Sequence, residues 1–175
     1  QVERMMRALA DRTDAALLFA THDLALAPLS AQAGVPVCVM HAQGDPETMQ
    51  DDPHYENVLL DVYDFLAAQI RRLVDTGVQR EQIVVDPGIG FGKTQEHNLI
   101  LLKSISLFHA LGCPVLLGVS RKRFVGTIGK EPQADLRAPG SIAVGLAGFA
   151  QGVQILRVHD VAETAQALRL WKAVR

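Results

Sequence analysis

Short apolar runs alternate with longer segments of helical periodicity through most of this chain, and the alternation strongly limits its possible folds. Four runs are nearly continuously apolar and rich in β-branched residues, which is typical of parallel strands buried on both faces: VPVCVM (35–40), IVV (83–85), PVLLGV (114–119) and VQILRV (153–158). The segment LLF (17–19) is a candidate fifth strand. Strands separated by helices in this regular order predict a parallel α/β fold.

Helical patterns fill the intervals between the predicted strands. The first begins after Asp52, a candidate N-cap with Pro53 at the first helical position, and ends at Gly77. An apolar repeat over residues 101–108 predicts one continuous helix before Gly112. Strand and helix therefore alternate along the chain.

The last two predicted helices differ in character. The small residues of SIAVGLAGFA (141–150) suit a helix that packs closely on a sheet. The final helix opens with Asp160 and Glu163 in capping-box positions. Four of its apolar residues are predicted to be buried: Val161, Ala165, Leu168 and Trp171.

Composition and charge exclude several classes of function. The chain has 175 residues, 49% of them hydrophobic, which is enough for one globular core and too few for two full domains. A formal net charge of -2 provides no general attraction to nucleic acid or to anionic membranes. Cys38 and Cys113 lie in apolar runs without metal-ligand spacing, so we predict buried, reduced thiols. No apolar run approaches the roughly 20 residues of a membrane span, and a cytoplasmic protein is expected.

Polar residues follow each of the four predicted strands at the point where the strand ends. In parallel α/β folds, ligands bind at the carboxyl ends of the strands, where several loops converge. One such residue alone is more often a helix cap or an exposed loop residue, but their recurrence after all four strands indicates one binding site. The residues are His41, then Asp86, then Ser120, Arg121 and Lys122, and finally Arg157 at the end of the fourth run and His159 just after it.

The stretch VVDPGIGFGK (84–93) resembles a phosphate-binding loop, yet it fits neither common nucleotide motif. A P-loop that contains Lys93 requires glycine at position 87, where the chain has Pro87, and a dinucleotide fingerprint requires glycine in place of Lys93. What remains is Asp86 at a strand end. Its carboxylate only accepts hydrogen bonds, and it suits the two parallel N–H donors of a guanidine-like edge. The charged donors that a phosphate or diphosphate needs lie on other strands: Lys122, Arg157 and His159.

Five motifs, in this order and in these strand or loop contexts, resemble those of dihydropteroate synthases, enzymes of folate biosynthesis. They are MHAQGDPETMQ (40–50), VVDPGIGFGKTQEHN (84–98), LLGVSRKRFVG (116–126), LRAPGSIA (136–143) and LRVHD (156–160). The resemblance implies a (β/α)8 barrel of TIM type and a transferase that condenses 6-hydroxymethyl-7,8-dihydropterin diphosphate with p-aminobenzoate, with the help of Mg2+. It also implies that these small molecules are the partners, that a homodimer is possible, and that the family is a sulfonamide target.

The resemblance further implies roles for residues at the strand ends. The implied pterin-binding residues are Asp86, Lys122, Arg157, Met40, Leu116 and Gly118; Arg157 and His159 bind the diphosphate; Ser120, Arg121 and Phe91 border the p-aminobenzoate pocket. Asp86 would accept hydrogen bonds from the 2-amino and ring N–H edge of the pterin. The carbon–nitrogen bond forms through a loose transition state, so the protein neutralises the leaving group and orients the amine, and no nucleophilic residue is required.

Part of the family pattern is absent from this sequence. A complete barrel needs eight strands and typically about 250 residues, so the resemblance implies an N-terminally incomplete barrel, its C-terminal half to five-eighths. Residues 1–23 are then a divergent segment and residues 24–175 the pterin-binding domain. The family asparagine that holds magnesium belongs to the absent first strand, and no metal ligand is expected in this chain. We expect impaired activity and poor stability or self-association.

Two other interpretations remain open. A related pterin-binding barrel could act as a methyltransferase domain on folates, although the polar groups of 120–122 and 157–159 suit a diphosphate that methyl transfer lacks. The other is an inactive barrel fragment that keeps part of a pterin site. Coupling of the dihydropterin diphosphate to p-aminobenzoate distinguishes the synthase from both.

Overall fold

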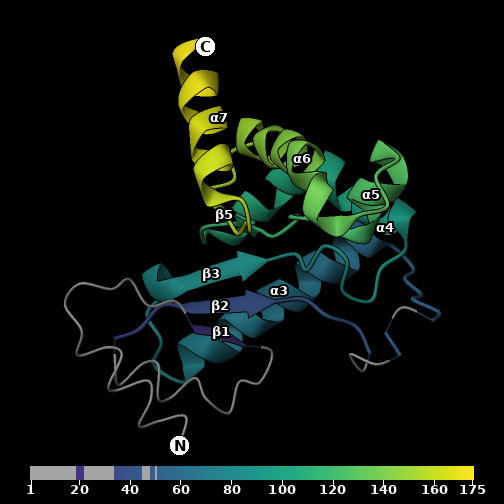
Figure 1. Ribbon diagram of the computed structural model, residues 1–175. Coiled ribbons are helices and arrows are strands. Elements are labelled where there is room, and N and C mark those ends of the chain that lie inside the picture. The colour runs from purple at the N-terminus through teal and green to yellow at the C-terminus, as the bar shows by residue number, and fades with distance from the viewer. Residues whose placement is uncertain (1–18, 22–33, 45–47, 50) are drawn as a thin grey trace, which may run out of the picture.

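The computed structural model describes residues 19–21, 34–44, 48–49 and 51–175. The strands are β1 (Phe19–Thr21), β2 (Val37–Met40), β3 (Ile83–Asp86), β4 (Leu116–Leu117) and β5 (Ile155–Leu156). β1, β2 and β3 form one parallel sheet in that order, and β4 pairs in parallel with β5. A parallel bridge between Val85 and Val115 joins the two parts (Figure 1). This confirms the predicted parallel α/β fold.

A helix follows each of β2, β3, β4 and β5. The helices are α3 (Val58–Asp75), α4 (Gln95–Lys103), α5 (Arg123–Gly129), α6 (Ala138–Ala150) and α7 (Val161–Ala173), with short 3-10 helices at Arg80–Gln82, Ile105–Leu111 and Ala134–Arg137. Figure 1 shows α3 alongside β1–β3, with α5, α6 and α7 in the upper part of the view, α5 next to α4 and α7 next to β5. The alternation of strands and helices agrees with the prediction, and α5 is a further helix that the apolar periodicity does not predict.

The two faces of the strands pack into different apolar clusters, because successive strand residues point to opposite faces. One face joins the large core that α3 covers; its strand residues are Val37, Val39, Ile83, Val85 and Leu117. The other face, called the inner face below, holds a small cluster of Cys38, Val84 and Leu116, against which Ile155 packs. Both cysteines of the chain are buried and free, as predicted.

The first long helix begins later than predicted. Helix α3 starts at Val58 rather than after Asp52, because the side chain of Asn57 accepts hydrogen bonds of 3.2 Å from the N–H groups two and three residues further on. The N–H of Asn57 donates in return to Asp61, at 3.1 Å. Such contacts satisfy the donors that the first helical turn leaves unpaired, which makes Asn57 the N-cap.

The second predicted helix is divided into two. Helix α4 ends at Lys103, and a 3-10 helix follows from Ile105. The apolar repeat continues across the break because Leu101, Ile105 and Phe108 all reach the same core. Helical periodicity alone therefore does not reveal the change of helix type at Ser104.

The last helix differs from the prediction at its first turn. Helix α7 follows Asp160, but the Asp160 side chain does not cap it. Its carboxylate pairs instead with Arg121, at 2.5 Å. Val161 is 65% exposed, contrary to the prediction, whereas the other three residues expected in its buried face are partly buried. Helix α7 makes its main helix contact with α6.

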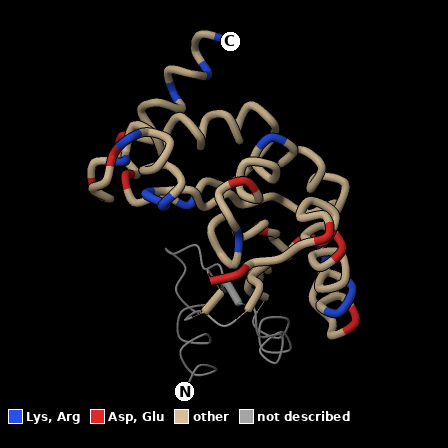
Figure 2. The backbone as a smooth tube through the Cα atoms, turned by 90° about the vertical axis from the view of Figure 1, so that its right-hand side faces the viewer, with Lys and Arg blue, Asp and Glu red and all other residues tan. Residues whose placement is uncertain are grey.

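Charged residues of both signs are spread over the described backbone (Figure 2). This distribution agrees with the small net charge of -2, which predicts no general attraction to a polyanion. In the described part of the chain, no helix has the length and apolar character needed to span a membrane. Binding of an anion must therefore depend on a local cluster of cations.

Candidate functional site

The strands bring four predicted site residues into one layer of the inner face. This strand-end layer comprises Met40, Asp86, Gly118 and Arg157, which stand two positions beyond the four residues of the small apolar cluster. Met40 pairs in register with Asp86, and the N–H of Arg157 donates to the carbonyl of Leu117 at 3.0 Å. Because residues two apart share a face, the layer lies directly above the cluster. Leu116, also predicted at the pterin slot, belongs to the cluster beneath.

Asp86 is the buried centre of the strand-end layer, with 1% of the residue exposed. Its Oδ1 accepts a hydrogen bond from the N–H of Gly88 (2.8 Å), and its Oδ2 pairs with Nη2 of Arg157 (3.3 Å). Gly88 has a φ of 68°, and a Cβ there would collide with the carbonyl of His41, so glycine is required for this turn. Burial raises the pKa of Asp86, and the Gly88 N–H and Arg157 oppose the rise. Its two oxygens offer about four acceptor sites, which leaves capacity for further donors.

Gly118 leaves the space that Arg157 occupies. A Cβ at position 118 would lie 2.7 Å from Nη2 of Arg157, too close for the two atoms to coexist. The guanidinium can therefore cross the end of β4 and reach Asp86 on β3. The Arg157 side chain is still 47% exposed, so part of its donor fork remains accessible to an anion. A cavity of about 210 Å3 lies here, lined by Gly118, Ser120, Lys122, Arg157, Val158 and His159.

Lys122 stands between this cavity and a second one. Its Nζ donates to the carbonyl of Ile89 and lies 4.1 Å from the centroid of the Phe91 ring. Burial lowers the pKa of Lys122 to about 8; the negative charge of Asp86 acts against this shift, and Arg157 adds to it. An anionic ligand beside Lys122 would favour its charged form.

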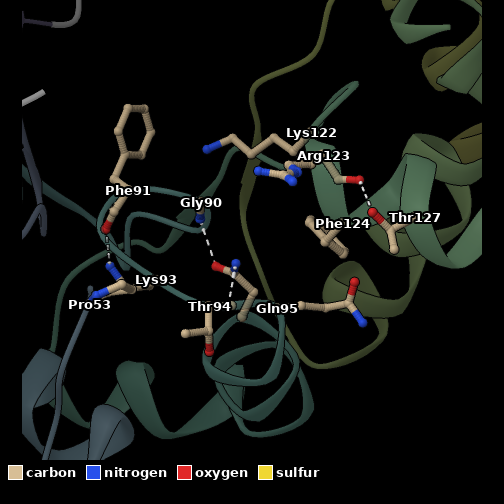
Figure 3. A pocket seen from close by; sticks show the side chains of 11 residues that line it. Pro53, Gly90, Phe91, Lys93, Thr94, Gln95, Lys122, Arg123, Phe124 and Thr127 are labelled. Carbon is tan, nitrogen blue, oxygen red and sulfur yellow. Dashed lines mark hydrogen bonds between the residues drawn. The ribbon is translucent and has the colours of Figure 1, made fainter. Parts of the chain in front are cut away.

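The second cavity, of about 550 Å3, opens on the other side of Lys122 (Figure 3). Phe91 and Phe124 contribute aromatic wall, and Arg123 contributes a cation. Figure 3 shows the Lys122 side chain reaching toward the loop that carries Gly90 and Phe91. The remaining lining residues are Pro53, Gly90, Lys93, Thr94, Gln95, Asn98 and Thr127. An apolar wall with a few cations suits a small aromatic anion.

Sequence reasoning misses the role of Lys93, because the motif comparison treats this residue only as part of a phosphate loop. Lys93 is 3% exposed. Its Nζ lies 2.8 Å from Nδ1 of His41 and donates to the carbonyls of Gly88 and Phe91, each at 3.0 Å. Burial lowers the pKa of Lys93 to about 7, and burial together with the charge of Lys93 lowers the pKa of His41 to about 3. The neutral imidazole can therefore accept a hydrogen bond from the lysine.

Two more contacts hold the loop of residues 87–93. The N–H of Gly90 donates to Oδ1 of Asn98 at 2.7 Å, and the hydroxyl of Tyr55 donates to the carbonyl of Gly92, also at 2.7 Å. These contacts come from α4 and from the segment before α3. Together with Lys93 they fix the backbone that presents one wall of the larger cavity.

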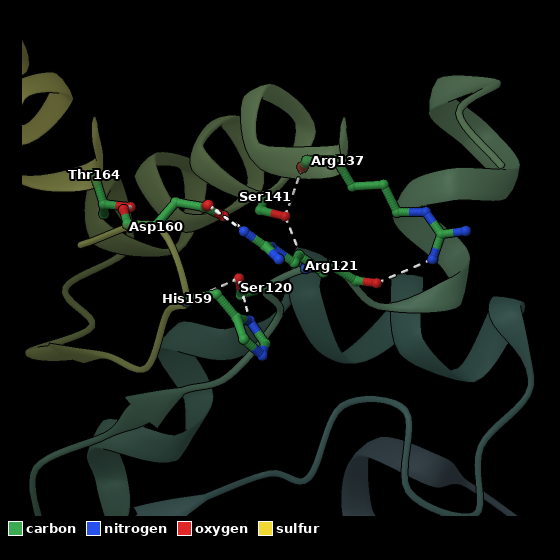
Figure 4. Close-up of polar contacts among 7 residues, drawn as sticks. All are labelled: Ser120, Arg121, Arg137, Ser141, His159, Asp160 and Thr164. Carbon is green, nitrogen blue, oxygen red and sulfur yellow. Dashed lines mark hydrogen bonds and ion pairs between the residues drawn. The ribbon is translucent and has the colours of Figure 1, made fainter. Parts of the chain in front are cut away.

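Two adjacent contacts link the ends of β4 and β5 (Figure 4). The Ser120 Oγ lies 2.9 Å from Nδ1 of His159 and accepts the N–H of His159 at 3.2 Å. The Arg121 guanidinium pairs with Asp160, the residue after His159. Arg121 lines neither cavity, whereas Arg123 lines the larger one. The place of Arg121 beside a p-aminobenzoate pocket stays a prediction.

Among the described residues, no group of three or more His, Cys, Asp or Glu side chains could hold a metal ion. Magnesium is usually bound by one or two carboxylates together with substrate phosphates. Asp86 is the one buried carboxylate of the described residues, and Gly88 and Arg157 already engage it. These residues do not fit a metal held by the protein.

Comparison with known proteins shows the family of this chain. Residues 13–159 match the family described as pterin binding enzyme. The chain belongs to this family. Among curated pterin binding enzymes, the dihydropteroate synthase of Haemophilus influenzae is 43% identical over 144 residues, which are 82% of this chain and 52% of that protein. The chain spans about half the length of the curated relatives it matches.

Solved structures of pterin binding enzymes share the fold. The dihydropteroate synthase of Thermus thermophilus in complex with 6HMPPP has a TM-score of 0.84 and 42% identity, covering 89% of this chain and 63% of that chain. The same synthase in complex with 4-aminobenzoate has a TM-score of 0.86 and 41% identity, covering 90% of this chain and 63% of that chain. The family match includes every strand-end residue from Met40 to His159, and α7 lies beyond it.

Proposed function

We propose that this chain supplies the C-terminal strand ends of a dihydropteroate synthase site, where 6-hydroxymethyl-7,8-dihydropterin diphosphate condenses with p-aminobenzoate. The observation that carries the proposal is Asp86, a buried carboxylate at a strand end with acceptor capacity left over. The 2-amino and ring N–H groups of a pterin form two parallel donors, the arrangement that a carboxylate binds best.

The pterin ring would lie along the strand-end layer. Gly118 provides a floor without a side chain, Met40 an apolar edge, and the planar guanidinium of Arg157 can stack on the ring. Asp86 would then gain the donors that compensate its removal from water, the effect that raises its pKa in the free protein. Recognition of the pterin edge would therefore stabilise a group that the fold alone leaves under-satisfied.

The diphosphate would occupy the mouth of the smaller cavity. Arg157 and His159 both line this cavity, and Lys122 closes its inner side. Hydrogen bonds from charged donors to phosphate oxygens are about twice as strong as neutral ones. Because the small net charge of the whole chain does not attract an anion, binding of the diphosphate depends on this local cluster.

The larger cavity would hold p-aminobenzoate. Its ring would pack on Phe91 and Phe124, and its carboxylate would pair with Arg123. Lys122 lines both cavities, so the amine would lie beside it, next to the methylene carbon of the pterin. This arrangement adds Arg123 to the p-aminobenzoate pocket, which the resemblance implies is bordered by Arg121.

The chemistry requires orientation and charge neutralisation. The bond between the methylene carbon and the diphosphate oxygen breaks, the amine nitrogen bonds to that carbon, and the amine loses a proton. Departure of the diphosphate leaves an electron-deficient methylene that the pterin stabilises. Lys122, Arg157 and His159 stand in place before the reaction, so they can stabilise the leaving group without reorganisation. Alignment of the amine in a preformed cavity lowers the entropic part of the barrier.

Several finer properties remain proposals for the whole protein. We propose that the described strands are one arc of a (β/α)8 barrel, that Mg2+ accompanies the diphosphate through residues outside those described, and that the protein is a cytoplasmic homodimer. The division into residues 1–23 and 24–175 stays a prediction, and the family match begins at residue 13, within the first segment.

The test couples the dihydropterin diphosphate to labelled p-aminobenzoate and measures dihydropteroate. The proteins compared are the 175-residue chain, the full reading frame of its source gene, and that frame carrying Asp86→Asn or, as a matched control, Asp75→Asn on the exposed surface of α3. We expect product from the full frame and the control, little from Asp86→Asn, and impaired formation by the chain alone. If the full frame binds pterin but forms no product, the result favours the inactive fragment. If that frame also transfers a methyl group to or from a folate, the result favours the methyltransferase.

A further inference from the structure

Arg121 has an unusual backbone conformation for its residue type. Its φ is 59°, in the left-handed region that residues with a Cβ rarely adopt. It stands directly between Ser120 and Lys122, which both line the smaller cavity. A strained residue persists only where its surroundings hold it, and such residues concentrate at functional sites.

Three contacts hold Arg121 in this conformation (Figure 4). Its N–H donates to Oγ of Ser141 at 2.8 Å, and its carbonyl accepts from Nη1 of Arg137 at 3.0 Å. Its guanidinium forms two bonds with the carboxylate of Asp160, at 2.5 and 3.2 Å. Backbone and side chain are therefore both engaged, and Arg121 lines neither cavity.

The contacts of Arg121 and of its neighbour Ser120 connect the same two loops. Ser120 is bonded to His159 and Arg121 to Asp160, so two consecutive residues after β4 are paired with two consecutive residues after β5. The left-handed turn at Arg121 separates Ser120, which meets His159, from Lys122, which turns toward the two cavities. The ion pair thus sets the relative position of the two loops that carry the cations.

We propose that Arg121 and Asp160 are positioning residues of the diphosphate site: their ion pair fixes the left-handed turn that presents Lys122 and holds His159 against Ser120. This inference rests on the proposed function, because it names the anion that the two loops bind. A charge argument supports it. Asp160 adjoins an anion site, where a free carboxylate would repel the ligand, and pairing with Arg121 neutralises it.

Calorimetric titration with inorganic pyrophosphate distinguishes positioning from direct contact. The variants are Arg121→Gly, which removes the side chain but keeps the left-handed turn accessible, Arg121→Lys, Asp160→Asn, and the double variant Arg121→Gly with Asp160→Asn. We expect about tenfold weaker binding for Arg121→Gly and for Asp160→Asn, partial recovery for Arg121→Lys, and a double variant no worse than either single one.

The sign of the Asp160→Asn effect is decisive. This change removes a negative charge near the anion site, so simple electrostatics predicts tighter binding of pyrophosphate, and so does a model in which freed Arg121 binds the ligand. Equal or tighter binding by Asp160→Asn, or additive losses in the double variant, would overturn the proposal. Arg71→Ala, on the exposed surface of α3, is the control and should bind as the wild type does.

If no protein in the series binds pyrophosphate, that result counts against the proposed function. A second measurement still tests the role of the ion pair in that case. The His159 N–H donates to Ser120 Oγ, so its hydrogen exchange reports whether the two loops stay together. We expect exchange at His159 about tenfold faster in Arg121→Gly and Asp160→Asn, in proteins whose far-UV circular dichroism matches the wild type. Unchanged exchange would show that the ion pair does not position His159.

Discussion

Replacement of Lys93 by methionine tests how the loop of residues 87–93 is held. Methionine has a similar length but offers neither charge nor donor. The carbonyl of Phe91 and Nδ1 of His41 lose Lys93 as a partner, at a cost of roughly 1–3 kcal/mol for each group left unsatisfied. The carbonyl of Gly88 also loses Lys93 but still accepts the N–H of Phe91 at 3.1 Å. The variant also avoids the burial of a charged ammonium, since Lys93 is 3% exposed. These two effects oppose each other, and pH separates them.

The direction of the pH effect follows from the lowered pKa. Burial lowers the pKa of Lys93 to about 7 from 10.5. Between these values the unfolded chain binds a proton that the folded protein does not bind, so the wild type gains stability as pH rises. The slope approaches about 1.4 kcal/mol per pH unit, and the whole effect is on the order of 5 kcal/mol. Below the folded pKa both states are protonated, and the contribution is constant.

Urea unfolding of the wild type and Lys93→Met at pH 6, 7, 8 and 9 provides the measurement. The difference between the two free energies of unfolding isolates Lys93, because Lys122 and the other titrating groups occur in both proteins. We expect this difference to shift by roughly 2 kcal/mol in favour of the wild type between pH 7 and pH 9. Lys103→Met, on the exposed surface of α4, should run parallel to the wild type. Parallel profiles for Lys93→Met itself would refute the burial of a titrating lysine.

Three further predictions concern ligands. Asp86→Asn should bind a pterin roughly 10 to 100 times more weakly in a fluorescence titration, because it loses a charged acceptor. Its free energy of unfolding should not fall. Unchanged affinity would remove Asp86 from the proposed site. Gly118→Ala should displace Arg157 and weaken pyrophosphate binding about tenfold, whereas Gly129→Ala, where a Cβ meets nothing within 4 Å, should have no such effect. Arg123→Ala in the full reading frame should raise the KM for p-aminobenzoate about tenfold with little change in kcat; an unchanged KM would leave the carboxylate without its proposed partner.

The strand-end layer could be predicted from the sequence because β-strands have a fixed period. Each apolar run places its last inward residue two positions before a site residue, and parallel strands end at the same edge. Counting along the runs therefore brings Asp86, Gly118 and Arg157 together without any knowledge of the loops. The same counting explains why Leu116 lies one layer deeper than Gly118.

The loops could not be predicted in this way. Arg121 adopts a left-handed turn that its residue type does not favour, and its partner Asp160 has an equally good local role as a helix cap. Lys93 is buried against His41, although lysine is usually exposed. In both cases a contact between residues distant in sequence overrides the local preference, and no periodic pattern records such a contact.

The site combines one carboxylate with several cations. This combination is explained if the carboxylate binds one end of a ligand and the cations bind the other end. Asp86 suits an N–H edge, whereas Lys122, Arg157 and His159 suit a diphosphate, and in the free protein Arg157 partly compensates the buried charge of Asp86. Arg157 can reach Asp86 because Gly118, which directly follows β4, has no side chain. In the proposed complex, pterin N–H groups would satisfy Asp86, so the guanidinium would no longer have to compensate it and could pair fully with the leaving group. The two ends of the proposed substrate would therefore meet groups whose charges are already coupled, and that coupling depends on a position that contributes only space.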